Sequence, residues 1–228
     1  MVYKLISPTE SQVGKYIDTN GDGIPEGIIF IDLVADKEKQ LKYDNKMYKI
    51  PTIKEKDNIK EYVVVGTYSH ALNGKREMLT PILDGEDRFY IMALQDVTQN
   101  EHYWYKNAFY KKMPDYEKTT LNVFGSGRQN TLNMMKKWTN EEYGKQDSLD
   151  IWNVIKEQVD NGWFIPSIRE WAAFAEELHI NFCDEISDSY WSSSQYNDVG
   201  AYGIDVDVSD LLMGGTILTF HVRLAKTI

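Results

Sequence analysis

The stretch PSIREWAAFAEEL, Pro166 to Leu178, decides the fold because it predicts one amphipathic helix with a clear beginning. Ser167 is followed three residues later by Glu170, which is the spacing of a capping box. In a capping box, each of the two side chains accepts a hydrogen bond from the backbone N–H of the other residue. Pro166 disfavours a helical conformation in the residue before it. We therefore expect the helix to begin close to Ser167.

One face of this helix is apolar. Trp171, Phe174 and Leu178 recur at the three- and four-residue spacing that brings side chains to the same side of a helix. We expect Trp171 and Phe174 to be largely buried, together with Trp163 and Trp191 from the flanking segments.

Further helices precede this one, and strands lie on both sides of the helical region. Residues 130–138 and 147–159 are predicted to be helices, the second of them capped by Asp147 or Ser148. The order of strands, then helices, then strands indicates an α+β fold with an antiparallel sheet. We expect a single domain over residues 1–228 with an elaborated β-rich N-terminal part. The predicted strands cover residues 26–34, 61–68, 88–94, 189–195, 201–208 and 216–228.

The composition is that of a folded, acidic protein. Of the 228 residues, 42% are hydrophobic, and the net charge is −10. No dense cluster of Lys and Arg is present, so we expect no nucleic-acid partner. A single cysteine, Cys183, excludes an internal disulfide and a zinc site made of cysteines. We expect no cofactor.

The sequence also bears on location. The first residues lack the apolar segment of a signal peptide, and the longest apolar runs are too short to cross a bilayer. We therefore expect a soluble protein without membrane insertion. An intracellular protein, a part of a virus particle and a fragment of a longer exported protein all agree with this.

A weak candidate for a metal site lies near the N-terminus. Asp18, Asn20 and Asp22 occupy the first, third and fifth positions of a calcium-binding loop. The twelfth position, which needs a bidentate carboxylate, is Ile29. A turn rich in Asx and Gly residues explains the same pattern. We expect weak calcium binding or none, so that thermal melts with calcium and with chelator coincide.

Two other patterns have a functional and a structural interpretation. The glycines of FGSGRQNT, residues 124–131, precede a helix, where backbone N–H groups hold anions, but a simple connecting loop explains them better. The three serines of residues 192–194 lack the elbow motif of a serine nucleophile, and we expect them to pair within a strand. The histidines lie far apart in the sequence, so no catalytic residue is assigned; they are His70, His102, His179 and His221.

The sequence resembles a known family over residues 162–228. The segments GWFIPSIREWAAFAEEL, YWSSSQY and VRLAKT follow in the order and spacing found in bacterial C-type lectin-like proteins related to the formylglycine-generating enzyme. This resemblance implies a compact fold with a short, twisted antiparallel sheet, two flanking helices and long loops on one face.

Two departures from that family limit the function that the resemblance implies. The enzymes use a pair of cysteines, whereas this chain has only Cys183, so oxidase activity is not expected. Sugar-binding C-type lectins use Glu-Pro-Asn or Gln-Pro-Asp with calcium, and neither tripeptide occurs here. The resemblance to lectins therefore concerns the fold alone.

A change in composition marks residues 196–221, which contain no Lys, Glu, Gln or Trp. Strands disfavour Lys and Glu, which is one explanation. The other is genetic, because codons that end in a pyrimidine encode none of these four residues and no Met. Diversity-generating retroelements, which act on C-type lectin-like proteins in the family, vary codons of this kind near the 3′ end of a gene. Met213 is the one residue of the segment that breaks the codon rule.

We therefore expect a binding module that displays this C-terminal segment to a protein or cell-surface ligand, on a phage or bacterial surface protein. In residues 205–208, Val206 and Val208 are predicted to face inward and the aspartates outward. A divergent enzyme of the same superfamily and an unvaried structural or adhesive domain remain as alternatives. The predicted ligand-binding residues are Tyr196, Asn197, Asp198, Tyr202, Ile204, Asp205, Asp207, Ser209, Asp210, Leu211, Leu212, Thr216, Leu218, Phe220 and His221.

Overall fold

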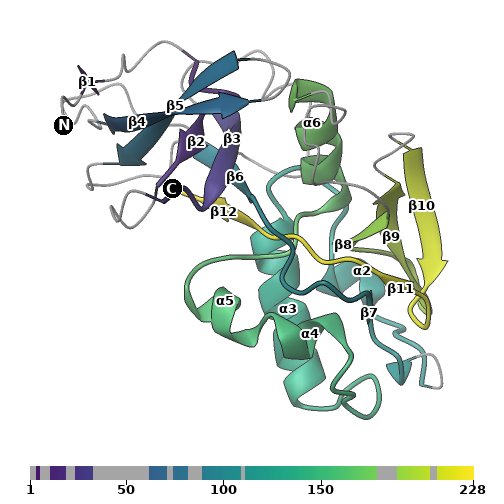
Figure 1. Cartoon of the computed structure of the whole chain (residues 1–228). Coiled ribbons are helices and arrows are strands. Elements are labelled where there is room, and N and C mark those ends of the chain that lie inside the picture. Colours follow the sequence, from purple (N-terminus) through teal and green to yellow (C-terminus); the bar gives the residue numbers. More distant parts are fainter. Residues whose placement is uncertain are drawn as a thin grey trace, which may run out of the picture.

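The chain has an α+β fold in which helices and mainly antiparallel sheets pack together (Figure 1). A computed structural model describes residues 4–5, 11–18, 24–32, 62–70, 74–81, 89–108, 111–178, 189–205 and 210–228. The helices are α2 (Tyr116–Thr119), α3 (Gly127–Thr139), α4 (Ile151–Val154), α5 (Lys156–Asp160) and α6 (Ile168–Leu178). The strands are β1 (Lys4–Leu5), β2 (Tyr16–Ile17), β3 (Gly27–Asp32), β4 (Tyr62–His70), β5 (Gly74–Pro81), β6 (Phe89–Ala93), β7 (His102–Tyr103), β8 (Ser189–Asn197), β9 (Gly200–Asp205), β10 (Asp210–Gly215), β11 (Thr219–Phe220) and β12 (Ala225–Thr227).

The strands form a large sheet and two smaller ones. Seven strands are ordered β1-β4-β5-β2-β3-β6-β12, and only the β2–β5 pair among them is parallel. A second sheet has the order β10-β9-β8, and β11 pairs with β7. In Figure 1, α6 lies between the large sheet and the three-stranded sheet. The helix therefore connects the two parts of the β structure.

The predicted strand over residues 216–228 is wrong as a single element. It divides into β11, which pairs with β7, and β12, which pairs with β6 in the large sheet. Between the two strands, residues 222–224 are buried although they belong to neither sheet. The chain thus passes from one sheet to the other, which a local pattern of apolar residues does not reveal.

The predicted helix over residues 147–159 is also wrong as a continuous element. It divides into α4 and α5 at the buried Ile155, and α4 begins only after Asp150. The Asp150 carboxylate makes no capping bond, because it accepts hydrogen bonds from the Trp138 indole at 2.7 Å and the Lys106 backbone at 2.9 Å. Long-range partners have therefore replaced the local cap that was expected from Asp147 or Ser148. In the described part of the chain, no helix is long and apolar enough to cross a membrane.

The predicted helix at Pro166–Leu178 is confirmed as α6, and so is its capping box. The Ser167 backbone N–H donates to Glu170 Oε2 at 2.6 Å, and the Glu170 N–H donates to Ser167 Oγ at 3.3 Å. Glu170 is fully buried. Its carboxylate also lies against the first residue of α3, because a Cβ on Gly127 would overlap Glu170 Oε2. One carboxylate therefore joins the beginnings of two helices.

The glycine loop before α3 thus holds a carboxyl group that belongs to the protein itself. Burial raises the pKa of Glu170 to about 7, and the backbone N–H groups of Ser167, Gly127 and Gly125 offset part of that shift. Gly125 has a φ of 84°, which favours glycine. The Ser126 side chain makes no capping hydrogen bond at the start of α3. The Glu170 carboxyl group takes the place of that cap.

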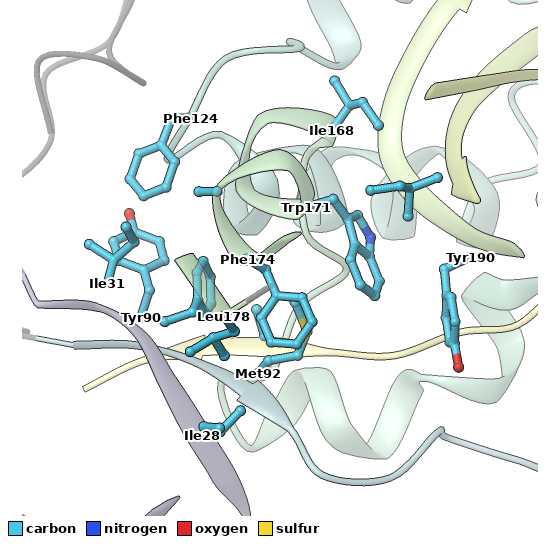
Figure 2. Close-up of a cluster of buried hydrophobic side chains, with 14 of the residues drawn as sticks. Ile28, Ile31, Tyr90, Met92, Phe124, Ile168, Trp171, Phe174, Leu178 and Tyr190 are labelled. Carbon is cyan, nitrogen blue, oxygen red and sulfur yellow. The ribbon is translucent and has the colours of Figure 1, made fainter. Parts of the chain in front are cut away.

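Aromatic side chains from α6 form the centre of the core. Figure 2 shows Trp171 and Phe174 pointing from the helix toward Met92, with Tyr190 beyond the indole ring. The rings of Trp171 and Tyr190 lie 5.2 Å apart. Burial of Trp171, Phe174 and Trp191 is confirmed. Trp163 is only partly buried: it packs against the core from one side, and Lys226 Nζ lies 5.7 Å from the centre of its ring.

Three indole N–H groups fix β8 within this core. Trp104 donates to the Ser192 carbonyl at 2.9 Å and Trp171 donates to the Trp191 carbonyl at 3.2 Å. Trp191 itself donates to the His102 carbonyl at 2.8 Å. The three tryptophans therefore stabilise the position of β8 both by burying their rings and by hydrogen bonding.

We predict that Trp171→Ala lowers the free energy of unfolding by about 3–5 kcal/mol, because it removes a fully buried indole and a hydrogen bond. Urea denaturation followed by circular dichroism measures the loss. Trp163→Ala serves as the control and costs less, since that ring is partly exposed. Equal losses in the two variants would contradict the described position of α6.

We predict that Glu170 makes the stability depend on pH. Between its ordinary pKa of 4.5 and about 7, the folded protein holds a proton on Glu170 that the unfolded chain has lost. The free energy of unfolding of the wild type, minus that of Glu170→Gln, should therefore fall as pH rises through this range. The steepest slope is about 1.4 kcal/mol per pH unit, and the difference is flat above pH 7 or so. A difference that does not change with pH would refute this.

Candidate binding face

The serines of the WSSSQ segment are part of the framework. All three of Ser192, Ser193 and Ser194 are fully buried in β8. The Ser192 hydroxyl donates to the Tyr202 carbonyl at 2.8 Å, and the Ser194 hydroxyl donates to the Leu121 carbonyl at 2.9 Å. Their hydroxyl groups thus connect β8 to β9 and to the loop before α3, as expected for structural serines.

The two histidines whose side chains are described, His102 and His221, have packing contacts of their own. His102 is buried in β7, with Nε2 at 2.6 Å from Thr98 Oγ1, and burial lowers its pKa. His221 packs against the Tyr190 ring, with a distance of 5.8 Å between the ring centres. His70 lies in β4, in the large sheet, and His179 lies outside the described residues.

The three-stranded sheet has two different faces. In the pairing of β9 with β10, Tyr202 lies opposite Met213, Ile204 opposite Leu211, and Gly203 opposite Leu212. Paired residues in an antiparallel sheet share a face, and neighbours along a strand alternate. One face therefore carries Tyr202, Ile204, Leu211 and Met213, and the other carries Gly203 and Leu212.

The face that carries Gly203 is filled by one ring. Phe220 lies 4.3 Å from the Trp191 ring, centre to centre. A Cβ on Gly203 would come within 3.1 Å of Phe220, and a Cβ on Gly214 within 3.1 Å of Trp191. The two glycines therefore leave the space that the rings of Phe220 and Trp191 occupy. Phe220 is packed on one side and partly exposed, so its ligand-binding role stays a prediction.

The opposite face is covered only in part. Ile204 is 4% exposed and belongs to the same core cluster as Trp171 and Tyr190, and this burial contradicts its predicted ligand-binding role. Leu211 is 47% exposed, and Met213 is 64% exposed. Figure 1 shows the reason, because β10 is the outermost strand and lies on the side of β9 away from α6.

Tyr196 completes this uncovered surface. Its ring lies over Gly200, where a Cβ would overlap the ring atoms, and its centre is 5.6 Å from that of Tyr202. Tyr196 and Tyr202 are both partly exposed. We define the open face as Tyr196, Tyr202, Leu211 and Met213.

The turn between β8 and β9 lies next to the open face. Asn197 Oδ1 accepts a hydrogen bond from the Val199 backbone at 2.9 Å, which fixes the turn. The Asp198 carbonyl accepts from the Met113 backbone at 2.7 Å, and the Asp198 carboxylate lies 3.8 Å from Lys112 Nζ. The turn is therefore held by its backbone while the Asp198 carboxylate stays accessible.

Two more residues of the predicted set belong to the framework. Thr216 is fully buried, and its backbone bonds to Val199 and Tyr105, so its ligand-binding role is wrong. His221 is placed beside Tyr190 and Asp96 in the packed region, which also excludes it from the open face. Both corrections follow from long-range packing of the segment after β10.

The remaining predicted residues have mixed outcomes. Asp205 is partly exposed and shares a face with Gly203, Leu212 is half-buried on that same face, and Leu218 is exposed at 48%. The side chain of Asp210 is not described, although its backbone pairs with Asp205 in the sheet. The predictions for Val206, Asp207, Val208 and Ser209 lie outside the described residues.

Two exposed residues were missed by the sequence analysis, Met213 and Ile217. Met213 is more exposed than any residue in the predicted set for which the structure gives an exposure. The segment LLMGGTIL is rich in large apolar residues, and nothing in its pattern says which of them the tertiary structure leaves uncovered.

A buried ion pair holds the Val222–Arg223 segment in place. Arg223 is buried, and its Nε donates to Asp96 Oδ1 at 2.6 Å. The Tyr190 hydroxyl donates to the other oxygen of Asp96 at 3.2 Å, and the guanidinium lies 5.6 Å from the centre of the Tyr190 ring. Arg223 therefore holds the chain after β11 against β8.

The predicted calcium loop is described only at its first position. Asp18 is buried directly after β2, whereas Asn20 and Asp22 lie outside the described residues. The described parts of the chain contain no group of three or more His, Cys, Asp or Glu side chains that could hold a metal ion.

Comparisons with known proteins were made at the level of families, sequences and structures. No model of a protein family matches the sequence, and no curated protein matches it. The structure is similar to that of a fimbrial protein from Bacteroides ovatus, with a TM-score of 0.45 and 14% sequence identity. That similarity covers 62% of this chain and 36% of the fimbrial protein, so the chain spans well under two thirds of its length. A likeness of this size decides neither the fold nor the function, which depend on the geometry above.

We predict that the two faces of the β8–β10 sheet respond differently to truncation. Phe220→Ala should lower the free energy of unfolding by about 2–3 kcal/mol, since it uncovers Trp191 and two glycines. Met213→Ser should change it by no more than about 0.5 kcal/mol, since the side chain is exposed. Urea denaturation of both variants tests this. A large loss for Met213→Ser would mean that the open face is covered.

Proposed function

We propose that the chain is a binding module that attaches to a protein or cell-surface ligand through the open face. The observation that carries the proposal is the exposure of Leu211 and Met213 beside two tyrosines on a sheet whose other face is packed. Exposed, contiguous apolar side chains on a soluble domain mark interaction sites more often than scattered ones do.

The distribution of exposed apolar residues supports this position. In the described part of the chain, eight large apolar side chains are exposed, and four of them are Leu211, Met213, Ile217 and Leu218. The others are distributed over the N-terminal region, the loop before α3, α3 itself and the loop before α4. Among the described residues, the exposed apolar side chains are therefore concentrated on β10 and the turn that follows it.

The support under the open face favours recognition. The carbonyls of β8 accept hydrogen bonds from Trp104 and Trp171, and Phe220 fills the back of β9 and β10. A rigid support reduces the conformational entropy that binding would otherwise cost. Tyrosine also suits such a surface, because it provides a large contact area with few rotatable bonds.

We also propose that the scaffold is C-type lectin-like. The residues of the family signature carry structural roles in this chain. Glu170 and Trp171 anchor α6, the serines of residues 192–194 are buried in β8, and Arg223 is paired with Asp96. On this proposal the signature describes a framework without a catalytic function.

A finer proposal is that a retroelement diversifies the displayed segment. The exposure of Leu211 and Leu218 and the partial exposure of Tyr196 and Tyr202 support it, because substitutions at exposed positions usually change stability little. Ile204 and Phe220 are packed, so we expect variation to spare them.

Genome sequencing tests this finer proposal. The expected result is a reverse-transcriptase gene beside a near-copy of the 3′ end of the gene, with the two copies differing only at adenines. The differences should fall in the codons of Tyr196, Tyr202, Leu211 and Leu218. A locus without such a copy would refute diversification while leaving the binding module unaffected.

We predict that substitutions on the open face abolish attachment without unfolding the protein. The test variant combines Tyr196→Ser, Leu211→Ser and Met213→Ser. The matched control combines Ile24→Ser, Leu132→Ser and Leu149→Ser, which are exposed apolar residues elsewhere on the surface. Flow cytometry measures saturable binding of the labelled proteins to intact bacterial and epithelial cells.

The expected result is attachment by the wild type and the control, and at least a tenfold loss in the open-face variant. Thermal melting of both variants within a few degrees of the wild type shows that the fold is retained. Equal attachment by the two variants, or no saturable attachment by the wild type, would refute the proposed function.

A further inference from the structure

The open face is continuous with a cluster of phenol rings and carboxylates. Tyr116 begins α2, which packs against β8, and Tyr196 and Tyr202 come from β8 and β9. Figure 1 shows α2 beside β8, on the same side of the molecule as the three-stranded sheet. Three tyrosines from three elements therefore lie around the β8–β9 turn.

Negative charge accompanies these rings. The Tyr116 hydroxyl donates to Glu117 Oε1 at 3.2 Å. Burial raises the pKa of the Tyr116 phenol, and the neighbouring Glu117, Asp198 and Tyr202 raise it further. These groups thus lie close enough to the phenol to act on it. The Asp198 side chain is 38% exposed, so it is accessible from solvent.

The chain already places one cation of its own at this position. Lys112 Nζ lies 3.8 Å from Asp198 Oδ2, and the lysine side chain is 71% exposed. At this distance and exposure, the ion pair contributes little to stability and is easily displaced. The contact nevertheless shows that an ammonium group reaches the Asp198 carboxylate of the cluster.

The chemistry of the cluster favours a positively charged ligand. The faces of aromatic rings carry negative potential and attract Lys and Arg side chains, and a carboxylate adds a charge-assisted hydrogen bond. The net charge of −10 acts in the same direction, because it attracts basic partners over a longer range. Leu211 and Met213, next to Tyr202 on the open face, provide an apolar surface beside the cation site.

We infer that the partner is a polypeptide that presents a Lys or Arg side chain to Tyr116, Tyr196, Tyr202 and Asp198, and an apolar side chain to Leu211 and Met213. The inference rests on the proposed function and specifies the chemistry of its ligand. Binding of this kind displaces Lys112 from Asp198. A neutral glycan would stack on the same rings without using the carboxylate, so dependence on charge separates the two ligands.

The direct test is an NMR titration of the full chain with the peptide acetyl-Leu-Arg-Phe-amide at millimolar concentration. Its matched control replaces Arg with citrulline, which has nearly the same shape and no charge, and maltotriose serves as the neutral glycan. The arginine peptide should shift the ring signals of Tyr116, Tyr196 and Tyr202. The citrulline peptide should bind at least fivefold more weakly.

Two substitutions separate the cation site from the rest of the face. Asp198→Asn should weaken binding of the arginine peptide about tenfold, because the charged acceptor is lost. Lys112→Ala should strengthen it about threefold, because the competing cation is removed. Thermal melts establish whether both variants fold. If Asp198→Asn does not fold, the effect of Lys112→Ala and the dependence of peptide binding on salt test the inference instead.

The inference is overturned if the arginine peptide produces no shifts, if both peptides bind equally, or if maltotriose binds while the arginine peptide does not. The cell-attachment assay distinguishes this failure from failure of the proposed function. Attachment that is lost in the open-face variant, but unchanged by Asp198→Asn and by 0.5 M salt, would refute the cationic partner and leave the binding module intact.

Discussion

The structure depends on one buried carboxylate, that of Glu170. It accepts the capping hydrogen bond of α6 and lies against Gly127, the first residue of α3, in a space too small for any side chain at that position. Because both helix ends direct N–H groups at the same carboxylate, α3 and α6 are fixed to each other at their beginnings. The cost of this arrangement is a pKa near neutrality, since burial opposes the charge that the N–H groups favour.

The beginnings of α3 and α6 position β8, the strand that supports the open face. Ser193 donates its backbone N–H to the Pro166 carbonyl just before α6 and accepts a bond from Asn130 of α3. Ser194 accepts a bond from the Ile168 backbone at the first residue of α6. β8 is thus bonded to both helices through small hydroxyl side chains. β9 and β10 extend outward from β8, so the outermost strand has exposed apolar residues on one face.

The β8–β10 sheet has a packed part and an uncovered part. Its inner part and its back are filled by rings from α6 and by Phe220, and these contacts need small residues at Gly203 and Gly214. Its uncovered part presents Tyr202 and Met213 next to an acidic turn. Under the proposed function, the negative charge of the protein would add to the contact area in selecting a partner, because charge complementarity contributes to specificity and to the association rate.

The sequence by itself determined the elements whose signals are local. The capping box that begins α6 and the apolar face of that helix follow from residues three or four positions apart, and the structure contains both. The strands rich in β-branched and aromatic residues, such as β3 and β6, likewise follow from short stretches of sequence. Only the tertiary structure decided which side chains the C-terminal segment displays. Ile204 is buried because α6 lies over it, and Met213 is exposed because β10 is the outermost strand of the β8–β10 sheet. Alternation along a strand defines two faces, but which face is covered depends on elements that are distant in the sequence.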